Sequence, residues 1–277
     1  MNDDNLTPLM RAAANGHLDE VKNLVENGES TDNPNEEGWT ALMIAADQGH
    51  LDVVRWLMDN GADVSQRNEN GDTPLLRAAA NGHVDVAELL VNNGADLNAQ
   101  GRYGETPLLY AAKGEHRRLV EWLVENGADV NVPDVDGKFP LMYAAQSGQL
   151  DFVKWLATKG AAVRAADIDE MTAAKYAQRS GHKDIEEYLV KAMKAAEEDE
   201  IKTIMEQAGD EETFEARWTP LMRAAAQGRL DVVQQLVEQG ADVNEKTKDG
   251  WTALMCAADS DSLEIIEYLQ QNGAAKE

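Results

Sequence analysis

The side chains best suited to chemistry in this chain are its histidines, and all of them occupy one position of a repeated pattern. Each stands ten residues after the residue that opens the same short motif: His17, His50, His83, His116 and His182. Imidazole can act as a general base or hold a metal. A catalytic base, however, would be expected at one place in the chain and not at the same position of many repeats. No two of these histidines have the short spacing of metal ligands on one helix. We therefore interpret them as structural residues that bond loop backbone at a turn between two helices.

The other candidates for chemistry lack the partners that their reactions need. Cys256 is the only cysteine, and no histidine or acid recurs beside it in its alanine-rich stretch, so nothing would activate it as a nucleophile. The segment 134–137, Asp-Val-Asp-Gly, has the first acids of a calcium loop but not the later glutamate. No GxxxxGK[ST] phosphate-binding loop occurs. The sequence predicts no enzyme, no cofactor and no metal site.

The elements that position these residues recur every 33 residues, except for one step of 47 between Thr172 and Thr219. A threonine such as Thr40 can cap a first helix, and a glycine such as Gly49 can end it in the left-handed conformation. A second helix follows, with apolar residues at helical spacing, and then a projecting loop. One such unit is too small to bury a core, so neighbouring units must stack. The motif opens at Thr7, Thr40, Thr73, Thr106, Phe139, Thr172, Thr219 and Thr252.

The repeated residues resemble those of the ankyrin-repeat family over nearly the whole chain. The resemblance rests on TPLM at 7–10, TALM at 40–43, TPLL at 73–76 and 106–109, and the downstream NGADV or NGADL. It implies an all-α ankyrin-repeat solenoid of eight full units, in which helix pairs stack and β-turn loops project. It also implies that the first helices and the loops line a concave groove that binds other proteins.

The irregular step of 47 residues suggests a ninth, truncated unit at about 190–215. In this interpretation residues 1–277 form a single solenoid, and the second helix of the sixth unit runs on through Tyr188 to about Ala196. The alternative is a flexible linker between two separate arrays, 1–190 and 216–277. Hydrogen exchange across 190–215 distinguishes the two interpretations.

The charge of the chain restricts its partners. The formal net charge is -26 at pH 7, with acids densest between Glu197 and Glu215, so phosphate backbones and anionic lipids should be repelled. No uncharged apolar run reaches the roughly 18 residues of a membrane helix. The single cysteine and the acidic start suggest a cytoplasmic protein. We expect a monomer that binds neither nucleic acid nor membrane.

The candidate binding residues are aromatic, arginine and aliphatic side chains on first helices and loops. Tyr110, Tyr143 and Tyr176 form a predicted row of central anchors, because tyrosine, tryptophan and arginine dominate interface energetics. With such acidic surroundings, we predict a protein partner that carries a basic patch. Two alternatives stay open: the aromatic residues only stabilise the fold, or the chain is an acidic mimic that occupies a nucleic-acid-binding protein. The predicted binding residues are Arg11, Trp39, Ile44, Arg77, Arg102, Tyr103, Tyr110, Tyr143, Tyr176, Trp218, Arg223 and Trp251.

Overall fold

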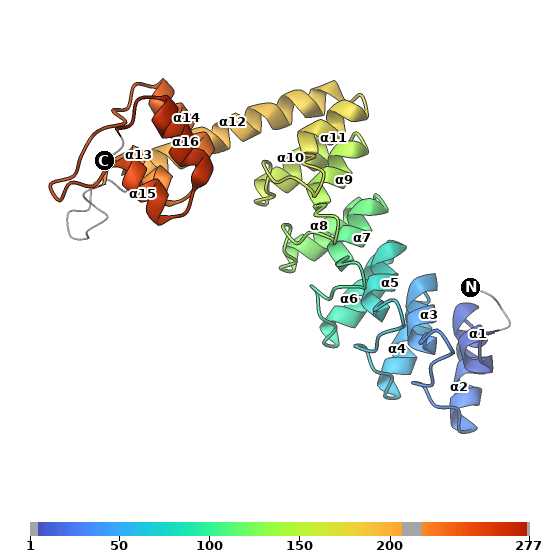
Figure 1. Cartoon of the computed structure of the whole chain (residues 1–277). Coiled ribbons are helices and arrows are strands. Elements are labelled where there is room, and N and C mark those ends of the chain that lie inside the picture. The colour runs from blue at the N-terminus through green and yellow to red at the C-terminus, as the bar shows by residue number, and fades with distance from the viewer. Residues whose placement is uncertain (1–4, 207–217, 276–277) are drawn as a thin grey trace. The chain divides into compact units, whose positions relative to one another are not determined.

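The computed structural model describes residues 5–206 and 218–275, without the side chains of 198–206. In this part of the chain the regular elements are helices, with one isolated bridge between Ala166 and Thr172. The all-α fold class is confirmed. The helices, drawn in Figure 1, are α1 (Pro8–Ala14), α2 (Leu18–Glu26), α3 (Ala41–Gln48), α4 (Leu51–Asp59), α5 (Pro74–Ala80), α6 (Val84–Asn92), α7 (Pro107–Lys113), α8 (Arg117–Glu125), α9 (Pro140–Gln146), α10 (Leu150–Thr158), α11 (Ala173–Arg179), α12 (Lys183–Glu206), α13 (Pro220–Ala226), α14 (Leu230–Glu238), α15 (Ala253–Asp259) and α16 (Leu263–Gln271).

The first helix of each repeat begins where the motif predicts. The hydroxyl of Thr40 accepts a hydrogen bond from the backbone N–H of Met43 at 3.3 Å, which satisfies one donor of the first turn. The other motif threonines cap their helices in the same way. Phe139 cannot, and Pro140 at the first helical position fixes the backbone there instead.

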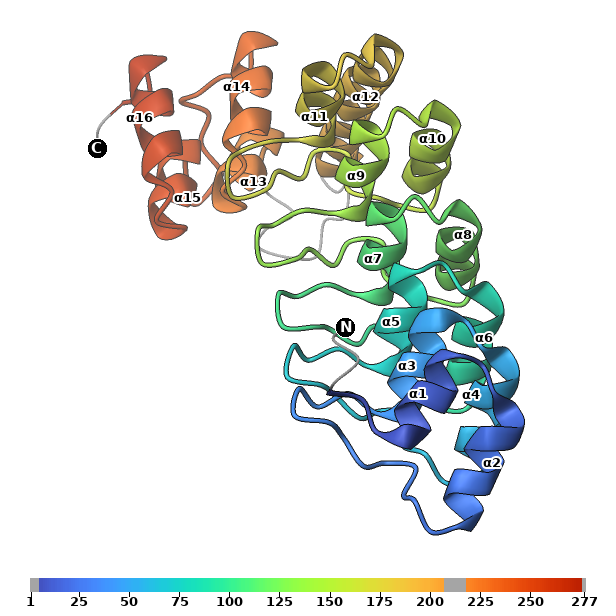
Figure 2. The same ribbon diagram turned by 90° about the vertical axis from the view of Figure 1, so that its right-hand side faces the viewer.

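The repeats of residues 1–190 stack through their first helices. Helix α1 contacts α3, and the same contact continues in order to α5, α7, α9 and α11. Within α3, Leu42, Met43, Ala45 and Ala46 are all buried, because flanking repeats cover the helix on both sides. Figure 2 shows the second helices as an outer row and the loops projecting beyond the first helices. The apolar flanks therefore bury one another, as the sequence predicts.

Four of the five histidines connect successive repeats, so their predicted structural role is confirmed, although the carbonyls that they contact belong to helix ends of the preceding repeat and not to loops. The Nε2–H group of His50 donates to the backbone carbonyl of Ala14 at 2.9 Å, at the end of the first helix of the preceding repeat. His83, His116 and His182 make the equivalent bond to Asp47, Ala80 and Gln146 at 3.0, 3.1 and 3.1 Å. His17, in the first repeat of this sequence, contacts Glu20 at 3.2 Å.

The chain divides into two compact units, unit 1 (Met1–Val190) and unit 2 (Lys191–Glu277). The helix of the sixth repeat runs on as predicted and passes Ala196, because α12 is one helix of 24 residues. The described part of the predicted truncated unit, up to residue 206, is therefore one continuous helix and no helix pair, and residues 207–217 lie outside the described part. Whether the units form one solenoid or two arrays stays a prediction.

Candidate functional site

A hollow of about 530 Å³ lies on the inner face of unit 1, between the first helices and the loops of the first three repeats. Three predicted binding residues contribute to it: Trp39 from a loop, Ile44 from α3 and Arg77 from α5. We call this hollow the groove. The remaining lining residues are Leu6, Ala14, Asn15, Glu37, Asp47, Gln48 and Asn70.

Arg77 is the central charged residue of the groove. Its guanidinium lies 5.1 Å from the centre of the Trp39 ring and forms ion pairs with Asp47 at 2.5 Å and Asp72 at 3.5 Å. The backbone N–H of Trp39 donates to the Asn35 side chain at 2.8 Å, which holds the loop that carries the ring. Two carboxylates thus contact one guanidinium, so the net charge of this cluster is negative.

The three predicted anchor tyrosines lie on the first helices α7, α9 and α11, where all three are half-buried. The Tyr143 hydroxyl donates to Asp134 Oδ2 at 3.0 Å, and the Tyr176 hydroxyl donates to Asp167 Oδ2 at 2.5 Å. Each aspartate is the first residue of the loop that precedes the helix of its tyrosine. Its other carboxylate oxygen accepts hydrogen bonds from backbone N–H groups of that loop. The tyrosines therefore connect the first helices to the loops.

Tyr110 finds its carboxylate in a different loop. The loop before Tyr110 has Gly101 at the position that Asp134 and Asp167 occupy in the next two loops. That position therefore offers no carboxylate to Tyr110. The Tyr110 hydroxyl reaches Asp72 of the preceding loop instead, at 3.4 Å. Because Asp72 also pairs with Arg77, the tyrosine row is connected to the groove.

All three tyrosines stay protonated donors over a wide range of pH. Burial, followed by the charges of Asp72 and Glu105, raises the pKa of Tyr110 to about 12. Burial and the neighbouring aspartates also raise the pKa of Tyr143 and of Tyr176. The phenol groups are therefore neutral hydrogen-bond donors to fixed carboxylates at physiological pH.

The other predicted residues of unit 1 differ in exposure. Arg11, Arg102 and Tyr103 are exposed. Ile44 has only 2% of its surface exposed, and Trp39 is also buried. These two side chains therefore pack beneath the surface of the groove and offer little exposed area to a partner.

The predicted residues of unit 2 form a small cluster of their own. The rings of Trp218 and Trp251 stack with their centres 6.0 Å apart. The buried Arg223 side chain donates twice to the backbone carbonyl of Trp218, at 2.7 and 3.2 Å. Arg223 therefore holds this loop and has little surface for a partner.

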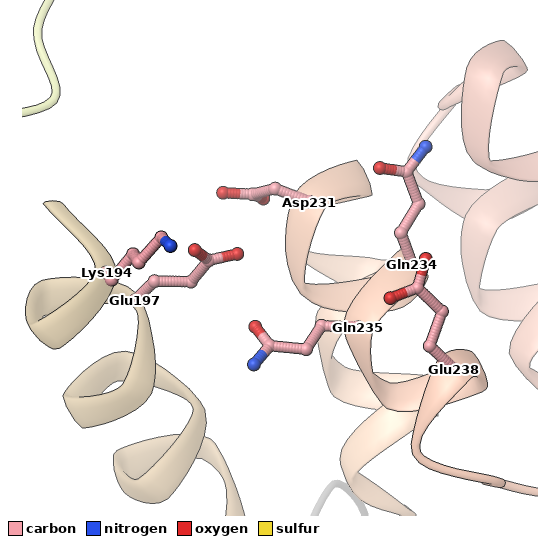
Figure 3. Close-up of a pocket in the computed structure, with 6 residues that line it drawn as sticks. All are labelled: Lys194, Glu197, Asp231, Gln234, Gln235 and Glu238. Carbon is pink, nitrogen blue, oxygen red and sulfur yellow. The ribbon is translucent and has the colours of Figure 1, made fainter. Parts of the chain in front are cut away.

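A second hollow, of about 350 Å³, lies within unit 2 (Figure 3). Lys194 and Glu197 project into it from α12, opposite Asp231 and Gln235 of α14. All its described lining residues are polar or charged, so it offers no apolar surface to an anchor residue. The acidic run from Glu197 to Glu215, on which the mimic interpretation depends, lies mostly outside the described residues.

Sequence reasoning missed two exposed apolar residues at the loop tips of unit 1. Val135 is 61% exposed and Ile168 is 70% exposed. They follow Asp134 and Asp167, at the loop position where earlier repeats have Glu36, Glu69 and Arg102. That change from charged to apolar side chains was the available signal.

The described residues contain no group of three or more His, Cys, Asp or Glu side chains arranged to hold a metal ion. None of their helices combines the length and apolar character needed to cross a membrane.

Comparison with known protein families covers the whole chain. The family model for ankyrin repeats (three copies) matches residues 1–68, 61–134, 119–199 and 192–277. No curated protein matches the sequence significantly.

Proposed function

Because this chain belongs to the ankyrin-repeat family, whose members are typically non-catalytic protein-binding scaffolds, we propose that its groove and tyrosine row bind a protein with a basic patch. The tyrosine row is Tyr110, Tyr143 and Tyr176. The partner would place lysine or arginine side chains against the carboxylates of this face and apolar groups against the tyrosine rings.

The observation that carries this proposal is the fixed pairing of each tyrosine with a carboxylate. Hydroxyl bonds to Asp72, Asp134 and Asp167 restrict the three rings before any partner arrives. A restricted side chain loses less conformational entropy on binding, which favours affinity. The same pairing places negative charge beside each ring, as a basic partner requires.

The pairing also means that the tyrosines stabilise the loops, so a binding role must be separated from a structural one. Tyr143→Phe removes the hydroxyl bond to Asp134 but keeps the ring, whereas Tyr143→Ala removes both. If the ring is an anchor, the alanine variant should lose about 2 kcal/mol of binding free energy, roughly 30-fold in affinity, and the phenylalanine variant much less.

The experiment uses the full chain as bait for proteins in a lysate of the source cells, followed by affinity measurement with the captured partner. Tyr188→Ala is the matched control, because Tyr188 is also half-buried but lies on α12, a second helix. We expect capture to weaken with salt and with Tyr143→Ala, but not with Tyr188→Ala. Equal binding by both alanine variants, or capture that does not respond to salt, would contradict the proposal.

A further inference from the structure

Three loop tips of unit 1 carry a row of exposed apolar side chains outside the groove. Tyr103 is 56% exposed, Val135 is 61% exposed and Ile168 is 70% exposed. They belong to three consecutive loops, 101–105, 134–138 and 167–171. Isolated exposed apolar residues are ordinary on protein surfaces, but a contiguous set indicates an interaction surface. We call Tyr103, Val135 and Ile168, with Asp136 and Asp169, the loop ridge.

Backbone hydrogen bonds join these loops into one surface. The N–H of Val135 donates to the carbonyl of Tyr103 at 2.9 Å, and the N–H of Ile168 donates to the carbonyl of Asp136 at 3.0 Å. The order of side chains along the ridge is therefore Tyr103, Val135, Asp136, Ile168 and Asp169. The ridge thus begins with two apolar residues, Tyr103 and Val135, and acidic and apolar residues alternate after them.

Each of the last two loops is also closed internally. Asp134 Oδ1 accepts from the N–H groups of Asp136 and Lys138 at 3.0 and 2.9 Å. Asp167 Oδ1 accepts from the equivalent N–H groups of Asp169 and Met171. A surface held in this way needs little ordering when it binds a ligand.

The charges of the loop ridge determine which kind of ligand it can bind. Asp136 and Asp169 are exposed and flank the apolar residues. Nearby cations include Lys138, whose Nζ lies 3.8 Å from Asp136, and Arg102, whose guanidinium lies 6.0 Å from the centre of the Tyr103 ring. Lys175 also reaches the third loop, where its Nζ donates to the Glu170 carbonyl at 2.7 Å. The exposed carboxylates favour a cationic ligand, and a second copy of a chain with net charge -26 would be repelled.

The spacing of the repeats sets the register of the occupant. Stacked first helices lie about 8–10 Å apart, so equivalent loop residues such as Val135 and Ile168 are separated by about that distance. In a polyproline II segment every third side chain faces the same way, with a repeat of about 9 Å. In a β-strand, side chains three residues apart face opposite ways. The polyproline II conformation therefore fits the ridge and the β-strand does not.

We propose that the loop ridge binds an extended peptide segment in which an apolar side chain recurs at every third position and is followed by a lysine or arginine. One apolar side chain packs between Tyr103 and Val135, and the next packs on Ile168. The basic side chains that follow them pair with Asp136 and Asp169. This inference rests on the proposed binding function and extends it to a surface outside the groove.

The test measures binding of labelled model peptides to the full chain by fluorescence anisotropy. The probe repeats Ile-Lys-Pro, which favours polyproline II, and the comparison peptides replace Ile by Ser, replace Lys by Glu, or insert a Gly to give a four-residue repeat. We expect the probe to bind about tenfold or more tightly than each comparison peptide, because each lacks apolar contact, charge or register.

Variants of the chain complete the test. Val135→Ser/Ile168→Ser should weaken binding of the probe about tenfold or more, and its thermal melting should match that of the wild type because both side chains are exposed. Leu263→Ser is the matched control, since Leu263 is 73% exposed but lies in unit 2, and it should bind the probe normally. Absence of probe binding, or unchanged affinity in the double variant, overturns the ridge proposal and leaves partner capture by the groove untouched. Loss of probe binding in Tyr143→Ala but not in the double variant also overturns it, while supporting the groove.

Discussion

Asp167→Ala should lower the free energy of unfolding of unit 1 by about 2–4 kcal/mol, because one buried carboxylate accepts three hydrogen bonds. Asp167 is 6% exposed and accepts from the Tyr176 hydroxyl at 2.5 Å and from the N–H groups of Asp169 and Met171 at 3.0 and 2.9 Å. Alanine leaves all three donors without this acceptor. Urea denaturation followed by circular dichroism measures the loss, and hydrogen exchange should accelerate at the amides of Asp169 and Met171.

Two further variants separate the causes. Asp169→Ala removes the same charge from an exposed position in the same loop and should change stability by less than about 0.5 kcal/mol. Asp167→Asn keeps an acceptor for the turn, as Asn35 and Asn68 do in earlier loops. It removes the negative charge that Tyr176 contacts, so it should cost about 1 kcal/mol. If Asp167→Ala costs no more than Asp169→Ala, the carboxylate does not hold the loop.

The effect of Asp167→Ala should depend on pH in the acid range. Burial opposes ionisation of Asp167, but hydrogen bonds from Tyr176, Met171 and Asp169 hold its pKa below the ordinary value of 3.8. A carboxyl with a lowered folded-state pKa contributes stability above its unfolded pKa and loses that contribution as the pH falls through the folded value. The difference between wild type and Asp167→Ala should therefore be full at neutral pH and shrink below about pH 3.8.

The sequence predicted the helix pairs and their boundaries well, because these follow from local rules. Threonine caps, proline at the first helical position and glycine at helix ends act within a few residues, and a repeat shows them many times. The single position shared by the histidines also indicated a structural role correctly. A pattern that recurs in every repeat identifies what all repeats need.

The site was less predictable because its properties depend on partners in neighbouring loops. The sequence placed Tyr110, Tyr143 and Tyr176 in one row, but their bonds to Asp72, Asp134 and Asp167 require the loops to fold back onto the first helices. Burial of Ile44 likewise depends on what the adjacent repeats bring beside it. Exposure of Val135 and Ile168 depends on the direction in which the loop turns. Position in the repeat alone could not decide these properties.

Glycine and histidine act together at four repeat interfaces of unit 1, where the pairs are Gly16 and His50, Gly49 and His83, Gly82 and His116, and Gly148 and His182. Gly49 has a φ of 78°, and a Cβ atom added there would lie 2.5 Å from Nδ1 of His83 in the next repeat. The chain also contains the reverse case. Glu115 replaces the glycine with a φ of 59°, and Gln149 replaces the histidine that would face it. The imidazole thus packs against the glycine, which has no side chain. At the interface where the glycine is replaced by Glu115, the histidine is replaced as well, by Gln149.

Gly49→Ala should therefore destabilise unit 1 by about 2–3 kcal/mol. About 1–2 kcal/mol comes from the left-handed backbone, and about 1 kcal/mol comes from displacing His83 from its bond to the Asp47 carbonyl. Because that bond connects the second and third repeats, the denaturation slope should also fall, as adjacent repeats unfold less cooperatively. Urea denaturation of the full chain measures both quantities.

Gly61→Ala provides the matched control for the backbone contribution alone. Gly61 has a φ of 93°, but a Cβ atom there would meet nothing within 4 Å, so this variant should cost only about 1 kcal/mol and leave the slope unchanged. The remaining difference should disappear on a His83→Ala background, since the alanine at 49 then has no imidazole to displace. Equal losses for the two glycine variants on the wild-type background would mean that contact between the histidine and the glycine does not couple the repeats. In that case the coupling between neighbouring repeats would come from the apolar contacts of the first helices alone.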